Sequence, residues 1–376
     1  MSTLVISNDF PPRTGGIESF VATACELLDD DVVVLTSSEP GDRAYDNGRR
    51  HPVHRLPWRT LLPTRRVAAA ATELLRSHGL RRVLFGAAAP LALLTPALRD
   101  AGAERVVALS HGHEVWWSAT PGFAGRIRRI GATVDALGHI SDFTGARIAA
   151  ALVPADRAKL VRLPPPVDLA RFRPDAAPTA SHRDGTVRVL AAGRFVPRKG
   201  WQVLLQAWRG VLAQLARQPD APPVRLDLVG TGPLAGRLRA RAAGFPPGTV
   251  AVHDAVPHDA MPALLAAADV FALPVRTPFP RIQPEGLGLT FVEAAACGLP
   301  VLVGESGGAP ETVVDGESGY QLDPDDATAW CRRLVELIRD PGRRVAMGKR
   351  GRRLAADRFA ATAVRTTLRT ALELRR

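Results

Sequence analysis

Short apolar runs alternate with longer amphipathic stretches along most of the chain. The runs 4–6 and 270–273 are wholly apolar, and the runs 32–36 and 187–192 are nearly so. Behind the first of them, apolar residues recur at helical spacing across residues 17–28. Buried strands that alternate with helices predict parallel sheets, and thus an α/β fold. We expect strands at 4–6, 32–36, 83–87, 106–110, 136–141, 187–192, 224–229, 250–253, 270–273, 301–303 and 320–322.

A chain of 376 residues is too long for one ordinary core and suits two domains. Residues 163–168, LPPPVD, contain three prolines, and the following stretch RFRPDAAPTASHRDG is polar. Prolines restrict the backbone of their neighbours and interrupt helices. We therefore place the connection between the domains at about residue 165.

The stretch 283–300, QPEGLGLTFVEAAACGLP, combines two carboxylates with a glycine-broken entrance to an apolar helix. Glu285 precedes the predicted helix, and Glu293 lies about one turn inside it. Backbone N–H groups of Gly286, Leu287, Gly288 and Leu289 would lack helical partners, and such a helix start attracts phosphate. The alternative interpretation is an ordinary helix with a polar beginning.

Further candidates follow other predicted strands. Gly15 and Gly16 lie in the loop between the first predicted strand and the helix behind it, an arrangement suited to binding phosphate or sugar. The dinucleotide pattern G-x-G-x-x-G is missing. Arg194 and Lys199 flank a loop that could neutralise a diphosphate. A metal at His111, His113 and Glu114 is not expected, because the two histidines would point to opposite faces of a continuing strand and a third ligand is missing.

Five stretches together resemble one enzyme family: NDFPPRTGGIESF, HGHE at 111–114, GRFVPRKG at 193–200, GTGPL at 230–234, and PEGLGLTFVEAAACGLPV with SGGAPE behind it. They are similar to the retaining nucleotide-sugar glycosyltransferases of family 4. Within that family, NDFPPRTGGI, FGAAAPLAL at 85–93 and HGHEVWWS resemble the phosphatidylinositol mannosyltransferases. The resemblance implies the GT-B fold, in which two Rossmann-like domains face each other across a crevice.

The resemblance also implies the role and the boundaries of each domain. Residues 1–165 would form the acceptor-side domain, residues 166–356 the domain that binds the nucleotide sugar, and residues 357–376 a helix that crosses back to the first domain. Pro165 and Pro166 replace the polar residue and glycine usual in the family, so we expect no donor contact from that pair.

The site residues that the resemblance implies fall into three groups. His111, Arg194, Lys199 and Glu285 would be catalytic: the histidine and Glu285 hold the donor sugar, and the two cations neutralise the leaving diphosphate. Glu293 would accept both ribose hydroxyls. The remaining donor contacts would come from Gly15, Gly16, Gly232, Gly286, Leu287, Gly288 and Leu289, and His113 and Glu114 would serve the acceptor.

The expected reaction is therefore retaining transfer of a hexose, best assigned as mannose from GDP-mannose, to a lipid-linked acceptor such as a phosphatidylinositol mannoside. No metal or other cofactor is expected. One alternative is a related enzyme that uses another nucleotide-linked sugar or a cyclitol and a small soluble acceptor. A non-enzymatic basic binding protein is a further alternative. Hydrolysis is disfavoured, because the carboxylates are not placed as a glycosidase pair.

The net charge of +12 favours an anionic partner, although no nucleic-acid module accompanies it. Arg65 and Arg76 lie opposite the apolar stripe of a predicted helix that opens at Pro63, and Arg81 and Arg82 follow its end. This basic face is either solvated or docks on an anionic membrane, where Trp116 and Trp117 would suit the interface. The chain begins without a signal peptide and has no apolar run of 18 residues, so we expect a cytoplasmic protein, peripheral on the inner face of the plasma membrane. The three cysteines are predicted to be buried thiols.

Overall fold

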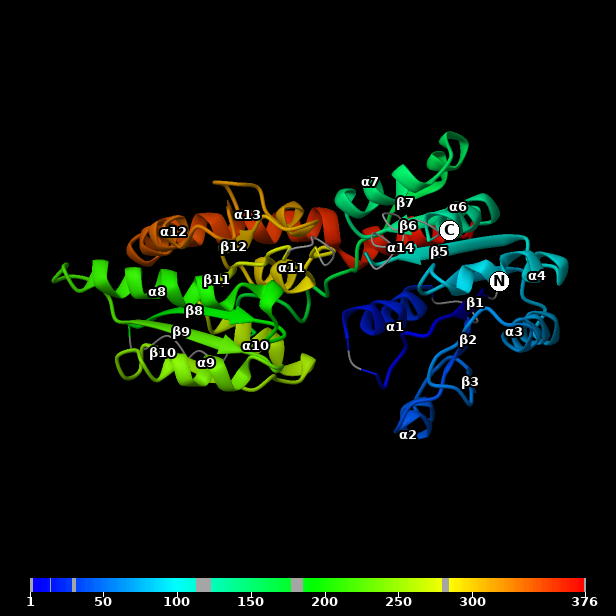
Figure 1. The fold of residues 1–376 in the computed structure, drawn as a ribbon, viewed down its shortest axis with the longest axis horizontal. Helices are drawn as coiled ribbons and strands as arrows, with labels where there is room; N and C mark the ends of the chain where they lie inside the picture. The colour runs from blue at the N-terminus through cyan, green and yellow to red at the C-terminus, as the bar shows by residue number, and fades with distance from the viewer. Residues whose placement is uncertain are drawn as a thin grey trace. The chain divides into compact units, whose positions relative to one another are not determined.

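The computed structural model describes residues 3–13, 15–28, 32–112, 123–176, 185–278 and 284–374. The chain divides into two compact units, drawn together in Figure 1. Unit 1 consists of Met1–Pro166 and Ala361–Arg376, and unit 2 of Val167–Ala360. Each unit is built on its own parallel sheet.

Unit 1 has a seven-stranded parallel sheet in the order β3-β2-β1-β4-β5-β6-β7. Its central strands are buried because helices cover them, whereas the edge strands β3 and β7 are only partly buried. Those two short edge strands escaped prediction, since they lack a continuous apolar run. The strands are β1 Thr3–Ile6, β2 Val32–Ser37, β3 Val53–Leu56, β4 Arg82–Phe85, β5 Arg105–Ser110, β6 Ala136–His139 and β7 Leu160–Arg162.

The helices of unit 1 connect these strands and are completed by the last helix of the chain. They are α1 Gly16–Leu28, α2 Asp42–Asp46, α3 Arg65–Ser77, α4 Thr95–Asp100, α6 Ala124–Thr133, α7 Asp142–Ala151 and α14 Ala361–Ala371, with the 3-10 turns η1 Leu91–Leu94 and η2 Pro154–Lys159. Helix α14 packs against α1, and Arg105 Nε donates to Ala371 O at 2.8 Å. The end of the chain therefore belongs to the same compact unit as its beginning.

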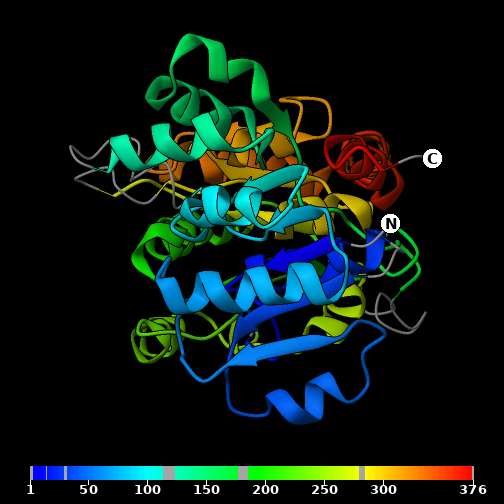
Figure 2. The same ribbon diagram turned by 90° about the vertical axis from the view of Figure 1, so that its right-hand side faces the viewer.

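Helix α3 begins two residues later than predicted. Pro63 was expected to open it, but Thr64 is the N-cap and its hydroxyl accepts a hydrogen bond from Val67 N. Val67, Ala71 and Leu75 are buried, as the apolar stripe predicted, and Figure 2 shows the helix lengthwise. The strand predicted at 136–141 likewise stops at His139, because Ser141 caps α7 through a capping box.

Unit 2 has a six-stranded parallel sheet in the order β10-β9-β8-β11-β12-β13. All six strands lie where the apolar runs predicted them, within a residue at each end. The strands are β8 Val187–Ala192, β9 Val224–Val229, β10 Val250–His253, β11 Val270–Leu273, β12 Val301–Gly304 and β13 Gly319–Leu322. The helices are α8 Trp201–Leu215, α9 Ala235–Ala242, α10 Met261–Ala266, α11 Leu289–Ala296, α12 Ala327–Arg339 and α13 Pro341–Phe359, with η4 Pro197–Lys199, η5 His258–Ala260 and η6 Ala309–Thr312.

The core of unit 2 includes three fully buried tryptophans. Trp201 and Trp208 come from α8 and Trp330 from α12, and these two helices pack against each other. Helix α11 packs in the same way against α13. Glu293 belongs to this second pair of helices, and Glu285 lies in the segment before it.

Cysteine and membrane predictions can be compared with the described residues. Cys25, Cys297 and Cys331 are buried free thiols, as predicted, and burial raises the pKa of Cys25 to about 12. Among the described helices, none is both long and apolar enough to cross a membrane.

Candidate functional site

The segment that leads into α11 is shaped by glycine and anchored by a buried leucine. Gly288 has a φ of +87° and is the N-cap of α11, which begins at Leu289. A Cβ at Gly288 would lie 2.5 Å from the ring of Phe291, so a larger residue would both strain the backbone and clash. Leu287 is almost fully buried, so its side chain anchors the segment in unit 2.

Glu285 forms the centre of a charge cluster in unit 2. Its Oε2 accepts hydrogen bonds from Arg198 Nη1 at 2.7 Å and from Lys199 Nζ at 2.8 Å. Burial alone would raise the pKa of Glu285, but Lys199 and Arg198 outweigh that effect and hold the pKa below its ordinary value. Glu285 is therefore a carboxylate with two fixed cations beside it.

The loop after β12 holds the backbone of Glu285 in place. Glu285 N donates to Ser306 Oγ at 3.3 Å, and Gly308 N donates to Glu285 O at 2.9 Å. Gly307 has a φ of +58°, and a Cβ there would lie 2.0 Å from Glu285 O. The motif SGGAPE thus supports the carboxylate, because only glycine permits so close an approach.

The cations around Glu285 differ from the predicted pair. Lys199 contacts Glu285 as the resemblance suggested, but its companion is Arg198, which sequence reasoning did not select. The Arg194 side chain is exposed and has no ion pair within the described part of the chain, whereas its carbonyl accepts from Trp201 Nε1 at 3.1 Å. The position of Arg198 directly beside Lys199 in the sequence PRKG could have identified it as the second cation.

The loop containing Gly232 lies beside the loop that carries these cations. Phe195 N donates to Thr231 O at 2.8 Å, and Leu234 N donates to Phe195 O at 3.0 Å. The stretches GRFVPRKG and GTGPL, which are distant in sequence, are therefore joined backbone to backbone. Both follow carboxyl ends of parallel strands, where α/β proteins bind ligands.

Glu293 lies inside α11 and has a histidine partner. Its side chain is only 6% exposed, and its Oε1 lies 3.0 Å from His258 Nε2. The hydrogen bond to Glu293 raises the pKa of His258 above its ordinary value, although burial opposes this effect. Sequence reasoning missed His258, because an isolated histidine outside any motif carries no recognisable pattern.

In unit 1, His111 follows β5 at the carboxyl edge of the sheet. It is buried, its Nε2 lies 2.5 Å from Gly86 O, and its ring meets Phe20 of α1 edge-on at 5.4 Å. Gly15 lies in the loop before α1, and Gly16 is the first residue of that helix. The ring contact with Phe20 thus joins His111 to the helix that follows the glycine loop. The predicted acceptor residues His113 and Glu114, with Trp116 and Trp117, lie outside the described residues.

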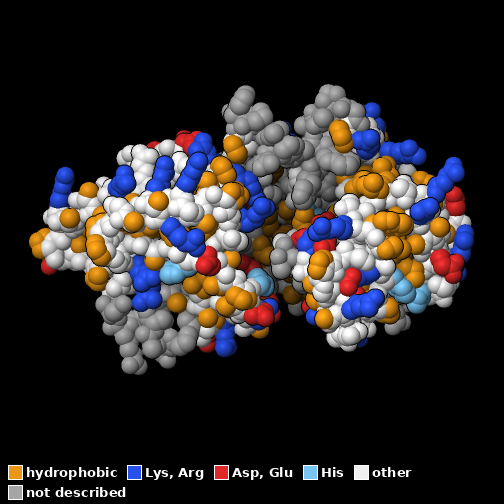
Figure 3. Space-filling model, turned by 60° about the horizontal axis from the view of Figure 1, so that its bottom comes forward, with side chains coloured by type: hydrophobic (Ala, Val, Ile, Leu, Met, Phe, Trp, Pro, Cys, Tyr) orange, Lys and Arg blue, Asp and Glu red, His pale blue; other side chains and the backbone are white. Residues whose placement is uncertain are grey.

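The four arginines proposed as a basic face divide into two pairs. Arg65 and Arg76 on α3 are exposed, and no ion pair is recorded for them among the described residues. Arg81 forms an ion pair with Glu104, and Arg82 Nε donates to Leu372 O at 2.9 Å. The Arg82 side chain therefore binds the backbone that follows α14. Figure 3 shows lysine and arginine side chains spread over the face in view.

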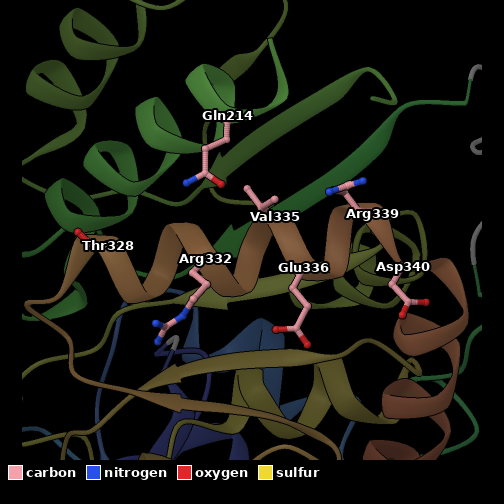
Figure 4. A pocket seen from close by; sticks show the side chains of 7 residues that line it. All are labelled: Gln214, Thr328, Arg332, Val335, Glu336, Arg339 and Asp340. Carbon is pink, nitrogen blue, oxygen red and sulfur yellow. The ribbon is translucent and has the colours of Figure 1, made fainter. Parts of the chain in front are cut away.

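A separate hollow of about 640 Å³ lies along α12 and contains none of the predicted site residues. Figure 4 shows Gln214 of α8 above Val335 of α12 in this hollow. Two of its acidic residues have structural roles: Glu336 pairs with Arg343, and Asp340 caps α13. Across the described ranges, no three histidine, cysteine or acidic side chains are grouped as metal ligands.

Comparison with known proteins decides the family. The profile of "Glycosyl transferases group 1" matches residues 174–354. A GDP-mannose-dependent alpha-(1-6)-phosphatidylinositol monomannoside mannosyltransferase of Mycolicibacterium smegmatis is 40% identical over 370 residues, covering 95% of this chain and 94% of the relative. The chain belongs to the group 1 glycosyltransferases. A GDP-mannose-dependent monoacylated alpha-(1-6)-phosphatidylinositol monomannoside mannosyltransferase of Corynebacterium glutamicum is also 40% identical, over 93% of this chain and 92% of the relative. The prediction of a glycosyltransferase similar to the phosphatidylinositol mannosyltransferases is confirmed.

Further proteins share a shorter segment of this chain or only its fold. A D-inositol 3-phosphate glycosyltransferase of Pseudarthrobacter chlorophenolicus is 35% identical over 52% of this chain. Anabaena HepE, solved with UDP and glucose, has a TM-score of 0.76 at 18% identity, with 99% of both chains covered. A sucrose-phosphate synthase of Thermosynechococcus elongatus has a TM-score of 0.75 at 20% identity, over 98% of this chain. The predicted GT-B fold with two parallel-sheet domains is confirmed.

Proposed function

We propose that this glycosyltransferase moves mannose from GDP-mannose to a phosphatidylinositol mannoside or a similar lipid-linked acceptor, with retention of anomeric configuration. The observation that carries the proposal of transfer is the cluster of Glu285, Arg198 and Lys199 beside the start of α11. The proposal of mannose, GDP and lipid draws on the relatives that match this chain over nearly its whole length.

The cluster has the chemistry that cleavage of a nucleotide sugar needs. When the bond to the sugar breaks, negative charge develops on the leaving diphosphate, and Lys199 and Arg198 are cations fixed before the reaction starts. Arg194 is a third cation on the same loop. The backbone at 286–289 would contribute N–H groups at the start of α11. These groups would supply the stabilisation that a divalent metal gives in other transferases, so we propose that no metal is required.

The two carboxylates would bind different parts of the donor. Both cations contact Oε2 of Glu285, so Oε1 can accept hydroxyl hydrogens of the sugar. Glu293 would accept the ribose hydroxyls, while Gly15, Gly16 and Gly232 would allow close approach of the donor. His111 would hydrogen-bond the sugar. Attack by the acceptor on the face that the diphosphate leaves would then retain the anomeric configuration, with the phosphate taking the acceptor proton.

We propose that the enzyme meets its acceptor by peripheral docking on an anionic membrane. Arg65 and Arg76 are available on α3, and the segment before that helix exposes Trp58 (38%) and Leu62 (55%). Each basic residue near an anionic surface contributes about 1 kcal/mol, so docking would be reversible and salt-sensitive. Arg81 and Arg82 would contribute less than the sequence alone suggested, because both have protein partners.

A small soluble acceptor is the second candidate function. The D-inositol 3-phosphate glycosyltransferases support it, although they match only about half of this chain. In that case the charge cluster and donor chemistry would remain, and only the acceptor would change.

Donor binding tests the proposal without assuming an acceptor. The purified protein is titrated by calorimetry with GDP-mannose, GDP-glucose, UDP-glucose and UDP-N-acetylglucosamine. We expect the tightest binding for GDP-mannose. Preference for a uridine nucleotide would contradict the proposed donor, and absence of binding to every donor would contradict the proposed transfer. Incubation with inositol phosphate or with lipid vesicles, followed by mass spectrometry, then separates the two acceptors.

A further inference from the structure

His258 links the buried Glu293 to the segment that begins unit 2. Its Nε2 contacts Oε1 of Glu293 at 3.0 Å, and its ring lies 5.7 Å from the ring of Phe172, centroid to centroid. Phe172 is itself held, because Arg352 of α13 donates to both Phe172 O and Ala296 O. The imidazole is thus fixed from two sides by parts of unit 2 that are distant in sequence.

The contact provides a hydrogen bond to one oxygen of the Glu293 carboxylate. Within the described ranges, His258 is the side chain that hydrogen-bonds Glu293, and it does so through Oε1 alone. Burial of a carboxylate that is only 6% exposed costs free energy unless hydrogen bonds replace those to water. His258 is 52% exposed, so it lies between the buried carboxylate and the surface, where a ligand can approach.

We propose that His258 is a positioning residue of the donor site: its imidazole holds Oε1 of Glu293 so that Oε2 is left for the ribose of a nucleoside diphosphate. This inference rests on the proposed function, which assigns the ribose to Glu293. It adds a residue that acts through Glu293, together with a dependence of donor affinity on pH.

The dependence on pH follows from the charges that face His258. Glu293 of α11 and Asp259 of η5 favour the protonated ring, whereas Arg171, which is paired with Asp259, opposes it. Near Glu293, burial raises the pKa of the Cys297 thiol, Glu293 adds to this effect and Arg352 opposes it. The hydrogen bond to Glu293 dominates and raises the pKa of His258. The protonated ring orders the carboxylate and adds positive charge near the donor, so donor affinity should be highest at low pH and fall as pH rises through that pKa.

The test is calorimetric titration of GDP into the wild-type protein, His258→Ala and His258→Gln between pH 6 and pH 9. Loss of one hydrogen bond to a charged partner should weaken GDP binding by about tenfold in His258→Ala at pH 6.5. Glutamine places an uncharged N–H donor near the Nε2 position, so His258→Gln should bind GDP within about threefold of wild type, without the decrease in affinity at higher pH. The titration of GDP itself is common to all variants and cancels in the comparison.

His253→Gln is the matched control. His253 lies in the same unit and also contacts a carboxylate, with Nε2 2.7 Å from Asp227 Oδ1, but it has no contact with Glu293. This variant should bind GDP like wild type and keep the wild-type pH profile. With GDP-mannose, His258→Ala should raise KM and leave kcat nearly unchanged, because His258 acts on the ribose side.

Two outcomes would overturn the inference. Equal GDP affinity of wild type and His258→Ala at every pH would show that the contact only completes the fold, and an unchanged pH profile in His258→Gln would assign the titration to another group. Both results leave the proposed function standing, provided that wild type binds GDP. Failure of wild type to bind GDP while it binds another nucleoside diphosphate would reject the proposed donor, and the same variants would then be compared with that nucleotide.

Discussion

Replacement of Glu285 by glutamine should destabilise unit 2 as well as impair transfer. The wild-type carboxylate accepts two charge-assisted hydrogen bonds, at 2.7 Å from Arg198 and 2.8 Å from Lys199. Glutamine keeps an acceptor oxygen but removes the charge, so two neighbouring cations lose their counter-ion. Charge-assisted hydrogen bonds contribute about 1.5–3 kcal/mol each, roughly twice as much as neutral ones, so the loss is about 1 kcal/mol per bond. We expect the free energy of unfolding to fall by about 2 kcal/mol at pH 7.

The pH dependence of the difference in unfolding free energy between wild type and Glu285→Gln shows whether the loss comes from charge or from packing. The pKa of Glu285 lies below its ordinary value in the folded protein. The stabilisation is therefore fully present above the pKa of an unfolded glutamate, about 4.3, and disappears as pH falls through the lower folded value. The difference between wild type and Glu285→Gln should be constant from neutral pH down to about 5 and should shrink below that range.

Urea unfolding followed by tryptophan fluorescence measures this difference. Trp201, Trp208 and Trp330 are all buried in unit 2, so they report on the unit that contains the cluster. Glu305→Gln is the control, because this exposed glutamate is close in sequence to Ser306 and has no recorded side-chain partner among the described residues. Equal stability of wild type and Glu285→Gln at pH 7, or a difference that persists unchanged in acid, would refute the assignment of a charged cluster.

Four further predictions concern activity and membrane binding. Glu285→Gln should mainly lower kcat, whereas Glu293→Gln should mainly raise KM for the donor, and wild-type kinetics in both would remove this segment from the site. Lys199→Ala should lower kcat/KM for the donor by at least about 100-fold, because charge on the leaving phosphate is left uncompensated. A decrease of less than about threefold would contradict the role of Lys199. Activity should survive EDTA, and restoration by magnesium or manganese after loss would reject metal-independent transfer. Wild type should co-sediment with anionic but not neutral vesicles at low salt, and Arg65→Gln with Arg76→Gln should reduce this binding while GDP affinity stays unchanged.

The sequence predicted most strands of the two parallel sheets, because buried strands consist of continuous apolar residues. The six strands of unit 2 lie where those runs indicated, but the edge strands β3 and β7 of unit 1 were missed. Their residues are only partly buried, so no continuous apolar signal marks them. Pairing with β2 and β6, which depends on the folded sheet, defines them instead.

The candidate site was predicted less completely, because its side chains are brought together by folding. The motifs GRFVPRKG and PEGLGLTFVEAAACGLPV identified Lys199, Glu285 and Glu293 as candidate site residues. The identity of the second cation depended on which side chain of the 193–200 loop turns toward Glu285, and Arg198 does so rather than Arg194. His258 is 35 residues from Glu293, and only the packing of η5 and α10 beside α11 makes them neighbours.

The central claim is transfer of mannose from GDP-mannose to a phosphatidylinositol mannoside, and analysis of the reaction product tests it most directly. The purified protein is incubated with GDP-mannose and anionic vesicles that contain a phosphatidylinositol monomannoside, and the lipid product is examined by mass spectrometry and by NMR of its new anomeric centre. The account predicts a lipid heavier by one hexose with an α-mannosidic linkage, formed by wild type and not by Lys199→Ala. An unchanged lipid, while inositol phosphate or another soluble acceptor is mannosylated, would contradict the lipid acceptor, and a β-linked product would contradict retention.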